Sequence, residues 1–337
     1  MNLYVTADAI GTPTGGGKVT FHESRALESM GPCEVWQFPE APRPWGADLE
    51  ARERLAARPG FVPQRAHFYS GTFSKTIEEL VRRGTYVTYT AAAHDINVSR
   101  EEHHRLGLPF DYPHLTDEHQ WAAYVRGYTL ADLVICPSTY SAQIMRGYGC
   151  QNVTVIPHGF DPVDRIAPMP ARFVVGYLGQ PGPDKGLSYL LDAWAAWEHG
   201  PGSILMIAGR GTQHLLPLVR QRLRGLYHVL GEVAEPRDLY DRCSVYVQPS
   251  ASEGFGCEVL EARAHGRPVI CSNGAGASAW SNIVVPACDV GALVRAIDRC
   301  HLTCVVDPAR LQAMAKIETI QHLTWDRIRD LYVGVWS

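Results

Sequence analysis

Residues 249–262 read PSASEGFGCEVLEA and connect a run of strand-forming residues to a segment with helical spacing. Two glycines, Gly254 and Gly256, let a ligand approach the backbone closely between strand and helix. Backbone N–H groups at the start of a helix favour anions, because they lie at the positive end of the helix dipole. Carboxylates stand before the turn, at Glu253, and on the helix, at Glu261. The stretch therefore predicts a strand–turn–helix unit of an α/β protein, with a site for a phosphorylated ligand that carries hydroxyl groups.

The rest of the chain continues the same alternation of strand-type and helix-type segments. Such alternation is typical of βα units, whose strands assemble into parallel sheets. Helical spacing of apolar residues is clearest at 187–194, 290–297 and 325–336. The stretch 39–65 is rich in Pro, Arg and Ala, and we expect a solvated, partly helical excursion there. Strands are predicted at 3–7, 35–38, 67–69, 86–89, 133–136, 153–156, 173–178, 204–208, 244–247 and 269–271.

The chain length and one irregular stretch divide the protein into two domains. At 337 residues the chain is too long for one ordinary core and suits two α/β domains of roughly 150 residues each. Between 157 and 172 the sequence is rich in proline and loses its periodicity, which is typical of a linker. Two domains imply a cleft between them. We expect an N-terminal domain at 1–160, a linker at 161–170, a C-terminal domain at 171–320 and a terminal helix at 321–337.

The composition favours a folded protein that acts on small molecules. Hydrophobic residues make up 46% of the chain and charged residues 20%, as in globular proteins. A formal net charge of −4 gives no basic field that would suggest nucleic-acid binding. The nine cysteines form no Cys-x-x-Cys pair, so we expect reduced, mostly buried thiols. The start of the chain lacks a basic segment and no run of 18 apolar residues occurs, which predicts a soluble, cytoplasmic protein without support for membrane contact.

Two familiar nucleotide-binding signatures fail in this sequence. A P-loop ending at Gly17–Lys18 would need glycine at position 12 and serine or threonine at position 19, where the chain has Thr12 and Val19. The Gly-x-Gly pairs at 15–17 and 254–256 both lack the third glycine of a dinucleotide fingerprint. The sequence therefore disfavours a P-loop protein and a nicotinamide or flavin enzyme.

Around the glutamate pair, the second half of the chain resembles a large family of retaining glycosyltransferases. That family has the GT-B fold and includes sucrose synthases and bacterial mannosyl- and glucosyltransferases. Its mark is two glutamates separated by seven residues, which Glu253 and Glu261 match. The resemblance implies two Rossmann-like domains whose parallel sheets face each other across a cleft, with the donor site in the C-terminal domain. Further similar segments follow the family order: GQPGPDKG at 179–186, AGRG at 208–211, LGEV at 230–233 and GRPVI at 266–270.

The roles that this resemblance implies also make chemical sense. Glu253 is expected to accept hydrogen bonds from hydroxyls of the donor sugar, and Glu261 from the vicinal hydroxyls of the ribose. Lys185 is expected to neutralise the diphosphate as it leaves. Glu253 and Lys185 are therefore catalytic candidates. Three backbone amides complete the expected donor site: Gly254, Phe255 and Gly256.

One departure from the family concerns positive charge. Family members commonly have an arginine at the position of Gln180, so a guanidinium on the diphosphate is missing here. Arg210 lies in a neighbouring strand-end loop and either supplies that charge or is a surface residue. The remaining alternative is a weakened or lost activity.

The first half resembles the family more weakly. The glycine-rich loop at its start predicts donor contacts at Gly16 and Gly17. His94 follows a predicted strand at the point where family members place a histidine facing the donor sugar, so it is a third catalytic candidate. Two further similar segments are ADLVICPS at 131–138 and VIPHGFD at 155–161.

The resemblance implies transfer of a hexose-type sugar from a nucleoside diphosphate sugar to a hydroxyl acceptor, with retention and without a metal or resident cofactor. UDP is preferred to GDP and ADP, with base contacts expected around 231–238. The acceptor class stays open and runs from a small sugar to a lipid, a polysaccharide or a modified nucleic-acid base. Two alternatives come from other classes: a sugar-nucleotide epimerase or hydrolase on the same fold, and a non-catalytic nucleotide-sugar-binding protein.

Overall fold

The protein forms two compact units. Unit 1 comprises Met1–Ala93, Phe110–His158 and Trp325–Ser337, and unit 2 comprises His94–Pro109 and Gly159–Thr324. The computed structural model describes residues 1–12, 14–41, 45–69, 72–93, 95–110, 118–198, 200, 202–223 and 226–337.

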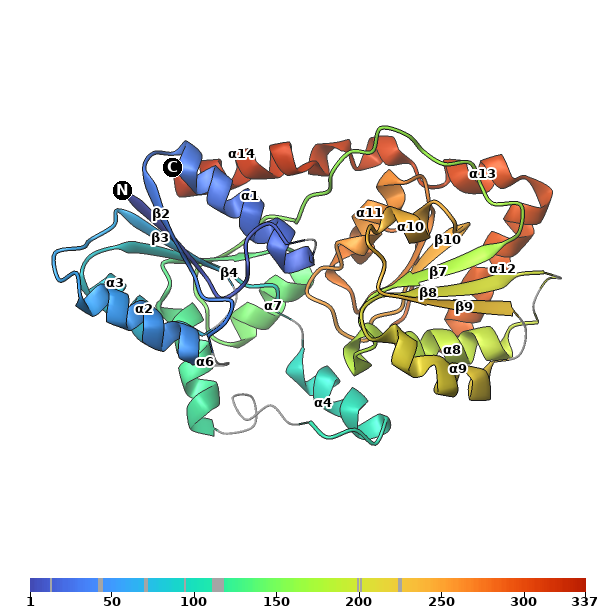
Figure 1. Cartoon of the computed structure of the whole chain (residues 1–337), viewed down its shortest axis with the longest axis horizontal. Coiled ribbons are helices and arrows are strands. Elements are labelled where there is room, and N and C mark those ends of the chain that lie inside the picture. Colours follow the sequence, from blue (N-terminus) through green and yellow to red (C-terminus); the bar gives the residue numbers. More distant parts are fainter. Residues whose placement is uncertain are drawn as a thin grey trace. The chain divides into compact units, whose positions relative to one another are not determined.

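Unit 1 is built on a six-stranded parallel sheet, in the order β2-β1-β3-β4-β5-β6 within the described residues. In Figure 1, α1 and α14 cover one face of this sheet, and α2 and α3 cover the other. The strands are β1 (Asn2–Thr6), β2 (Cys33–Gln37), β3 (Arg65–Tyr69), β4 (Tyr86–Thr90), β5 (Leu133–Cys136) and β6 (Val153–Val155). The helices are α1 (Gly15–Ser29), α2 (Gly46–Ala56), α3 (Ser74–Arg82), α6 (Glu118–Leu130), α7 (Thr139–Gly147) and α14 (Trp325–Trp336).

The face of this sheet toward α2 and α3 is apolar. Leu3 of β1 and Phe68 of β3 are fully buried in a cluster that includes Ala51 of α2 and Ile77 of α3. Successive strand residues point to opposite faces, so only alternate positions enter this cluster. The stretch 39–65, expected as a solvated and partly helical excursion, thus contributes a helix whose inner face is part of the core.

The opposite face carries a buried polar network beneath α1 and α14. The carboxylate of Glu23 accepts hydrogen bonds from the hydroxyls of Tyr4 (2.9 Å) and Tyr332 (2.8 Å), and His67 Nε2 lies 3.2 Å from it. The rings of Trp336 and His67 are 4.7 Å apart between centroids. Burial alone would raise the pKa of Glu23, but the charge and hydrogen bond of His67 lower it. Helix α14 therefore supplies partners for a buried, ionised carboxylate.

Unit 2 repeats the plan with a second six-stranded parallel sheet, in the order β12-β11-β10-β7-β8-β9 among the residues described. The strands are β7 (Val174–Leu178), β8 (Ile204–Ala208), β9 (Leu226–Gly231), β10 (Val245–Gln248), β11 (Val269–Ser272) and β12 (Ile283–Val285). The α-helices are α4 (Ile96–Arg105), α8 (Leu187–Ala196), α9 (Leu216–Arg222), α10 (Arg237–Tyr240), α11 (Glu258–Ala264), α12 (Val290–Val306) and α13 (Pro308–Ala313). Short 3-10 helices are η1 (Pro183–Lys185), η2 (Thr212–Leu215), η3 (Gly276–Trp280), η4 (Ile317–Thr319) and η5 (Gln321–Leu323).

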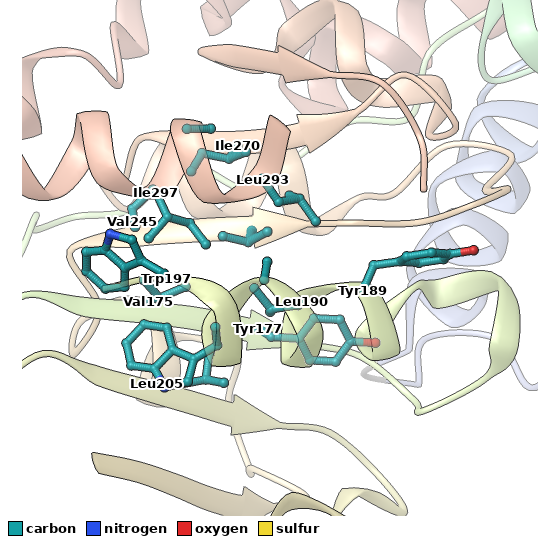
Figure 2. Close-up of a cluster of buried hydrophobic side chains, with 14 of the residues drawn as sticks. Val175, Tyr177, Tyr189, Leu190, Trp197, Leu205, Val245, Ile270, Leu293 and Ile297 are labelled. Atoms are coloured by element: carbon teal, nitrogen blue, oxygen red, sulfur yellow. The ribbon is translucent and has the colours of Figure 1, made fainter. Parts of the chain in front are cut away.

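The core of unit 2 lies between its sheet and the helices α8 and α12. Leu190 of α8 and Ile297 of α12 are fully buried beside strand residues such as Val175, Leu205 and Val245 (Figure 2). Because this sheet is packed on helices, its central strands are near-continuous apolar runs, as in other parallel sheets. This core fixes the strand ends from which the candidate site is built.

The two parallel sheets with flanking helices confirm the predicted α/β fold class, and each segment predicted as a strand forms one. The sequence does not predict β9 and β12, which are the two outer strands of the unit 2 sheet. The segment that contains α4 lies within the range predicted for the N-terminal domain but is part of unit 2. The terminal helix α14, which the sequence assigns to neither domain, is part of unit 1.

Candidate functional site

The turn after β10 carries Glu253 and is fixed by contacts within the chain. The Glu253 amide donates to the carbonyl of Gly274 over 2.9 Å, and a Cβ at position 274 would lie 2.3 Å from the carbonyl oxygen of Ala251. Gly256 has a φ of +93°, which residues with a side chain rarely adopt. Phe255 is buried with its ring 5.5 Å from that of Trp280, so its side chain anchors the turn. A donor contact of the amides at 254–256 remains a prediction.

A second turn, at the end of β7, brings Lys185 to Glu253. Gly186 has a φ of +66°, and a Cβ there would lie 2.0 Å from the carbonyl oxygen of Pro249, so only glycine lets the two turns approach this closely. The Lys185 ammonium forms an ion pair with the Glu253 carboxylate. Burial alone would lower the pKa of Lys185, but the carboxylates of Glu253 and Glu258 raise it. Lys185 is therefore a cation at neutral pH.

Glu258 is a third acid of this group, which the sequence analysis does not single out. It begins α11 three residues before Glu261, a spacing that puts both on one side of the helix. Burial raises the pKa of Glu258 to about 7; the charge of Lys185 opposes this rise, and the charges of Glu253 and Glu261 add to it. The charge of Glu258 therefore changes near neutral pH. In the sequence, the only indication of Glu258 as a site residue is its position between Glu253 and Glu261.

Glu261 is held by a tyrosine of α10, a helix that also borders a pocket. Its Oε2 accepts a hydrogen bond from the Tyr240 hydroxyl over 3.2 Å, and Tyr240 is fully buried on α10. Burial and then the Glu261 carboxylate raise the pKa of Tyr240 well above its usual value, so Tyr240 stays a hydrogen-bond donor. Helix α10 and the loop after β9 line a pocket of about 500 Å³, whose wall includes Glu232, Val233 and Asp238. These three residues belong to the loop expected to contact the nucleotide base.

Gln180 and Arg210 lie side by side at the ends of β7 and β8. Oriented by its hydrogen bonds, the Gln180 amide turns its oxygen to the guanidinium and accepts from Arg210 Nε over 3.0 Å and also from Nη2. The glycine before Arg210 makes this approach feasible, because a Cβ on Gly209 would lie 2.2 Å from the carbonyl oxygen of Gly179. Arg210 thus contacts the residue that replaces the family arginine. Its contact with a diphosphate is still a prediction.

The candidates in the first half of the chain belong to unit 1 or fall outside the described residues. Gly16 and Gly17 lie in the first turn of α1, where the Gly17 amide donates to the capping hydroxyl of Thr14 over 3.0 Å. A Cβ on Gly17 would lie 2.0 Å from Thr12 Oγ1, so the turn itself requires this glycine. His94 lies outside the described residues. Donor contacts of Gly16 and Gly17 stay predictions.

Two kinds of feature are absent from the part of the chain that the structure describes. No group of three or more His, Cys, Asp and Glu side chains is arranged to hold a metal ion there. None of the helices in those ranges combines the length and the apolar character needed to cross a lipid bilayer.

Comparisons with known proteins match both halves of the chain. Residues 13–164 match the family described as Glycosyltransferase Family 4, and residues 172–302 match the family described as Glycosyl transferases group 1. The lipopolysaccharide core biosynthesis mannosyltransferase LpcC of Rhizobium leguminosarum bv. viciae is 31% identical over 176 residues, which are 46% of this chain and 49% of that protein. The chain spans about half the length of the curated relatives it matches.

Solved structures match the fold over nearly the whole chain. Sucrose-phosphate synthase from Thermosynechococcus elongatus has a TM-score of 0.77 at 19% identity, covering 99% of this chain and 98% of that one. Anabaena HepE in complex with UDP and glucose has a TM-score of 0.72 at 17% identity, covering 100% and 99%. The two parallel sheets and these matches define the class, a protein of the GT-B fold. Within that class, the N-terminal half of the chain matches the Family 4 model and the C-terminal half matches the group 1 model, so both halves are similar to glycosyltransferases.

Proposed function

We propose that the protein transfers a hexose-type sugar from a nucleoside diphosphate sugar, with UDP as the preferred nucleotide, to a hydroxyl acceptor. One observation carries the proposal: Lys185, Glu253 and Glu261 gather where β7 and β10 end in unit 2. Ligands of open α/β sheets bind at the carboxyl ends of the strands. A cation beside two carboxylates suits a ligand that has both phosphate and hydroxyl groups.

In this proposal the diphosphate binds to Lys185 and Arg210. The Lys185 ammonium is paired with Glu253 in the free protein, so a diphosphate takes the place of that carboxylate. The freed Glu253 then accepts hydrogen bonds from the sugar, while Glu261, held by Tyr240, accepts them from the ribose. Arg210 beside Gln180 supplies the guanidinium that the family arginine would otherwise provide.

The relatives support this choice of donor. LpcC is named a mannosyltransferase, and the HepE structure contains UDP and glucose. The first name supports a hexose as the transferred sugar, and the second supports UDP as the nucleotide. The acceptor of this chain stays open among hydroxyl compounds.

The proposed reaction retains the anomeric configuration. The acceptor oxygen forms a bond to the anomeric carbon on the face from which the diphosphate leaves, and the bond between that carbon and the diphosphate oxygen breaks. The acceptor hydroxyl gives its proton to the leaving phosphate oxygen, so the products are a glycoside and a nucleoside diphosphate. Lys185 and Arg210 balance the charge that develops on the diphosphate, and such fixed charges act mainly in the transition state.

The proposal is tested by binding first and by turnover second. We expect UDP to raise the melting temperature of the protein, whereas NAD and ATP–magnesium leave it unchanged. Equal stabilisation by NAD would contradict the donor class. Consumption of the nucleotide sugar without an acceptor identifies a hydrolase, and tight binding without turnover across an acceptor panel identifies a binding protein.

A chelator tests the role of Lys185 and Arg210 in place of a metal. Because these two cations hold the diphosphate in the proposal, turnover should be unchanged when EDTA is added. The measurement is release of the nucleoside diphosphate with and without EDTA. Complete loss of release with EDTA, restored by manganese, would overturn the metal-independent form of the proposal.

A further inference from the structure

Helix α4 is a piece of unit 2 that interrupts the sequence of unit 1. It follows β4 and precedes α6, both of which belong to unit 1, yet its own segment clusters with unit 2. Val98 packs against the apolar core of unit 2, and Ser99 is buried. The contacts of α4 within unit 2 reach the two turns that carry Lys185 and Glu253.

The N-terminal half of α4 is bonded to both of these turns. Ser99 Oγ donates to the carboxylate of Asp184 over 3.0 Å, and Asp184 is the residue directly before Lys185. The carbonyl of Asp184 in turn accepts from the amide of Ala251 over 2.8 Å. The amide of Asp95, which caps α4, donates to Ser252 Oγ over 2.7 Å, directly before Glu253 in the sequence.

The C-terminal half of α4 is bonded to the first turn of α8, which follows Lys185 in the chain. The Tyr189 hydroxyl donates to Glu102 Oε1 over 2.6 Å, and Arg105 bonds the other oxygen of the same carboxylate over 2.8 Å. Arg105 also donates to Ser188 Oγ over 2.7 Å and lies 4.2 Å from the centre of the Tyr189 ring. Tyr189 stands at the edge of the core cluster with its hydroxyl pointing away from it (Figure 2). Glu102 is buried, at 6% exposed, so its hydrogen bond with Tyr189 is shielded from water.

We propose that α4 is a positioning element of the donor site, and that Ser99 and Glu102 hold the Lys185 turn in place from both sides. The inference rests on the proposed function, because it assigns Lys185 to a diphosphate. The turn lies between Gly182 and Gly186 and would otherwise sample many conformations. Fixing it before the ligand arrives reduces the ordering cost of binding and keeps the ammonium where charge develops.

The test compares conservative variants of α4 and α8 with a matched control. Ser99→Ala removes the hydroxyl bonded to Asp184, and Tyr189→Phe removes the donor to Glu102 without emptying the core. Glu101→Gln is the control, because Glu101 neighbours Glu102 but is exposed. For each variant, UDP affinity is measured by calorimetry, turnover by UDP release, and amide hydrogen exchange over residues 183–190 by mass spectrometry.

We expect Ser99→Ala and Tyr189→Phe each to weaken UDP binding about five- to tenfold, the scale of the net contribution of one ordinary hydrogen bond. Exchange over 183–190 should become faster in both, and Ser99→Thr should restore affinity because it keeps a hydroxyl. Glu101→Gln should match the wild type. A variant that melts normally and exchanges faster yet binds UDP like the wild type overturns the inference. Unchanged exchange in both variants overturns it as well, whereas absence of UDP binding by the wild type overturns the proposed function itself.

Discussion

Replacing Glu258 with glutamine should change how the stability of unit 2 depends on pH. Burial raises the pKa of Glu258 from 4.5 to about 7, so the folded protein favours the neutral acid. The neutral carboxyl stabilises the fold fully below the pKa of the unfolded chain. As the pH rises toward 7, the unfolded chain ionises more readily, and this stabilisation is lost. Glutamine has no proton to lose and escapes this effect.

The size of the effect follows from the two pKa values. Each pKa unit corresponds to about 1.4 kcal/mol, so a rise in the pKa of Glu258 from 4.5 to about 7 corresponds to about 3 kcal/mol of unfolding free energy. Partial exposure of the side chain and its coupling to Lys185 reduce this figure. We therefore expect the free energy of unfolding of Glu258→Gln, relative to that of the wild type, to rise by about 1–3 kcal/mol as the pH goes from about 4.5 to 7.5, and to stay at that level at higher pH.

Urea unfolding at a series of pH values measures this difference. Amide hydrogen exchange of the β10 strand reports on unit 2 separately from unit 1, because β10 lies at the centre of the unit 2 sheet. Glu198→Gln, at an exposed acid of the same unit, is the control and should follow the wild type at each pH. A free-energy difference between Glu258→Gln and the wild type that stays constant from about pH 4.5 to pH 8 would refute the placement of a buried, neutral acid in this site.

Three further predictions concern single side chains. Glu261→Gln should weaken binding of both UDP and the UDP-sugar by about 1–3 kcal/mol in calorimetry, whereas Glu253→Gln, which removes the carboxylate that a diphosphate displaces from Lys185, should not weaken UDP binding and should sharply lower turnover; wild-type turnover in the Glu253 variant would contradict these roles. Arg210→Ala should weaken UDP binding by about 1.5–3 kcal/mol if its guanidinium meets the diphosphate, and unchanged affinity would leave Arg210 as a partner of Gln180 alone. Glu23→Gln should destabilise unit 1 by about 3 kcal/mol near neutral pH and less in acid, because the lowered pKa of Glu23 makes its stabilisation disappear as the pH falls; equal urea midpoints would argue against a buried, ionised Glu23.

The sequence predicts the fold well because alternation of strands and helices is a local pattern. The outer strands β9 and β12 are not predicted, and the reasons are also local. Strand β9 is half-exposed and has a histidine in its middle, while β12 has only three residues, so neither shows a long apolar run. The packing of α4 on unit 2 and of α14 on unit 1 depends on contacts between distant residues, which periodicity does not report.

The residues of the candidate site are predictable from local motifs, but the contacts between them are not. The family resemblance points to Lys185, Glu253 and Glu261, but their pairing with each other and with Tyr240 depends on glycines that let separate turns approach. The contact between Gln180 and Arg210 depends on the close approach of two strand ends, which the sequence does not report, and the role of Arg210 toward a diphosphate stays a prediction. Glu258 was visible in the sequence, yet its raised pKa is a property of burial.

The position of α14 has a consequence for the order in which the protein matures on the ribosome. Translation delivers the strands of unit 1 first, then unit 2, and only afterwards Tyr332 and Trp336, which complete the surroundings of Glu23 and His67. Before α14 emerges from the ribosome, Glu23 and His67 lie on their sheet face without Tyr332 and Trp336. Unit 2 is therefore free to fold before α14 has been made, whereas unit 1 reaches its final state only after α14 has been translated, so chaperones that hold nascent chains can act on unit 1 while unit 2 is being synthesised.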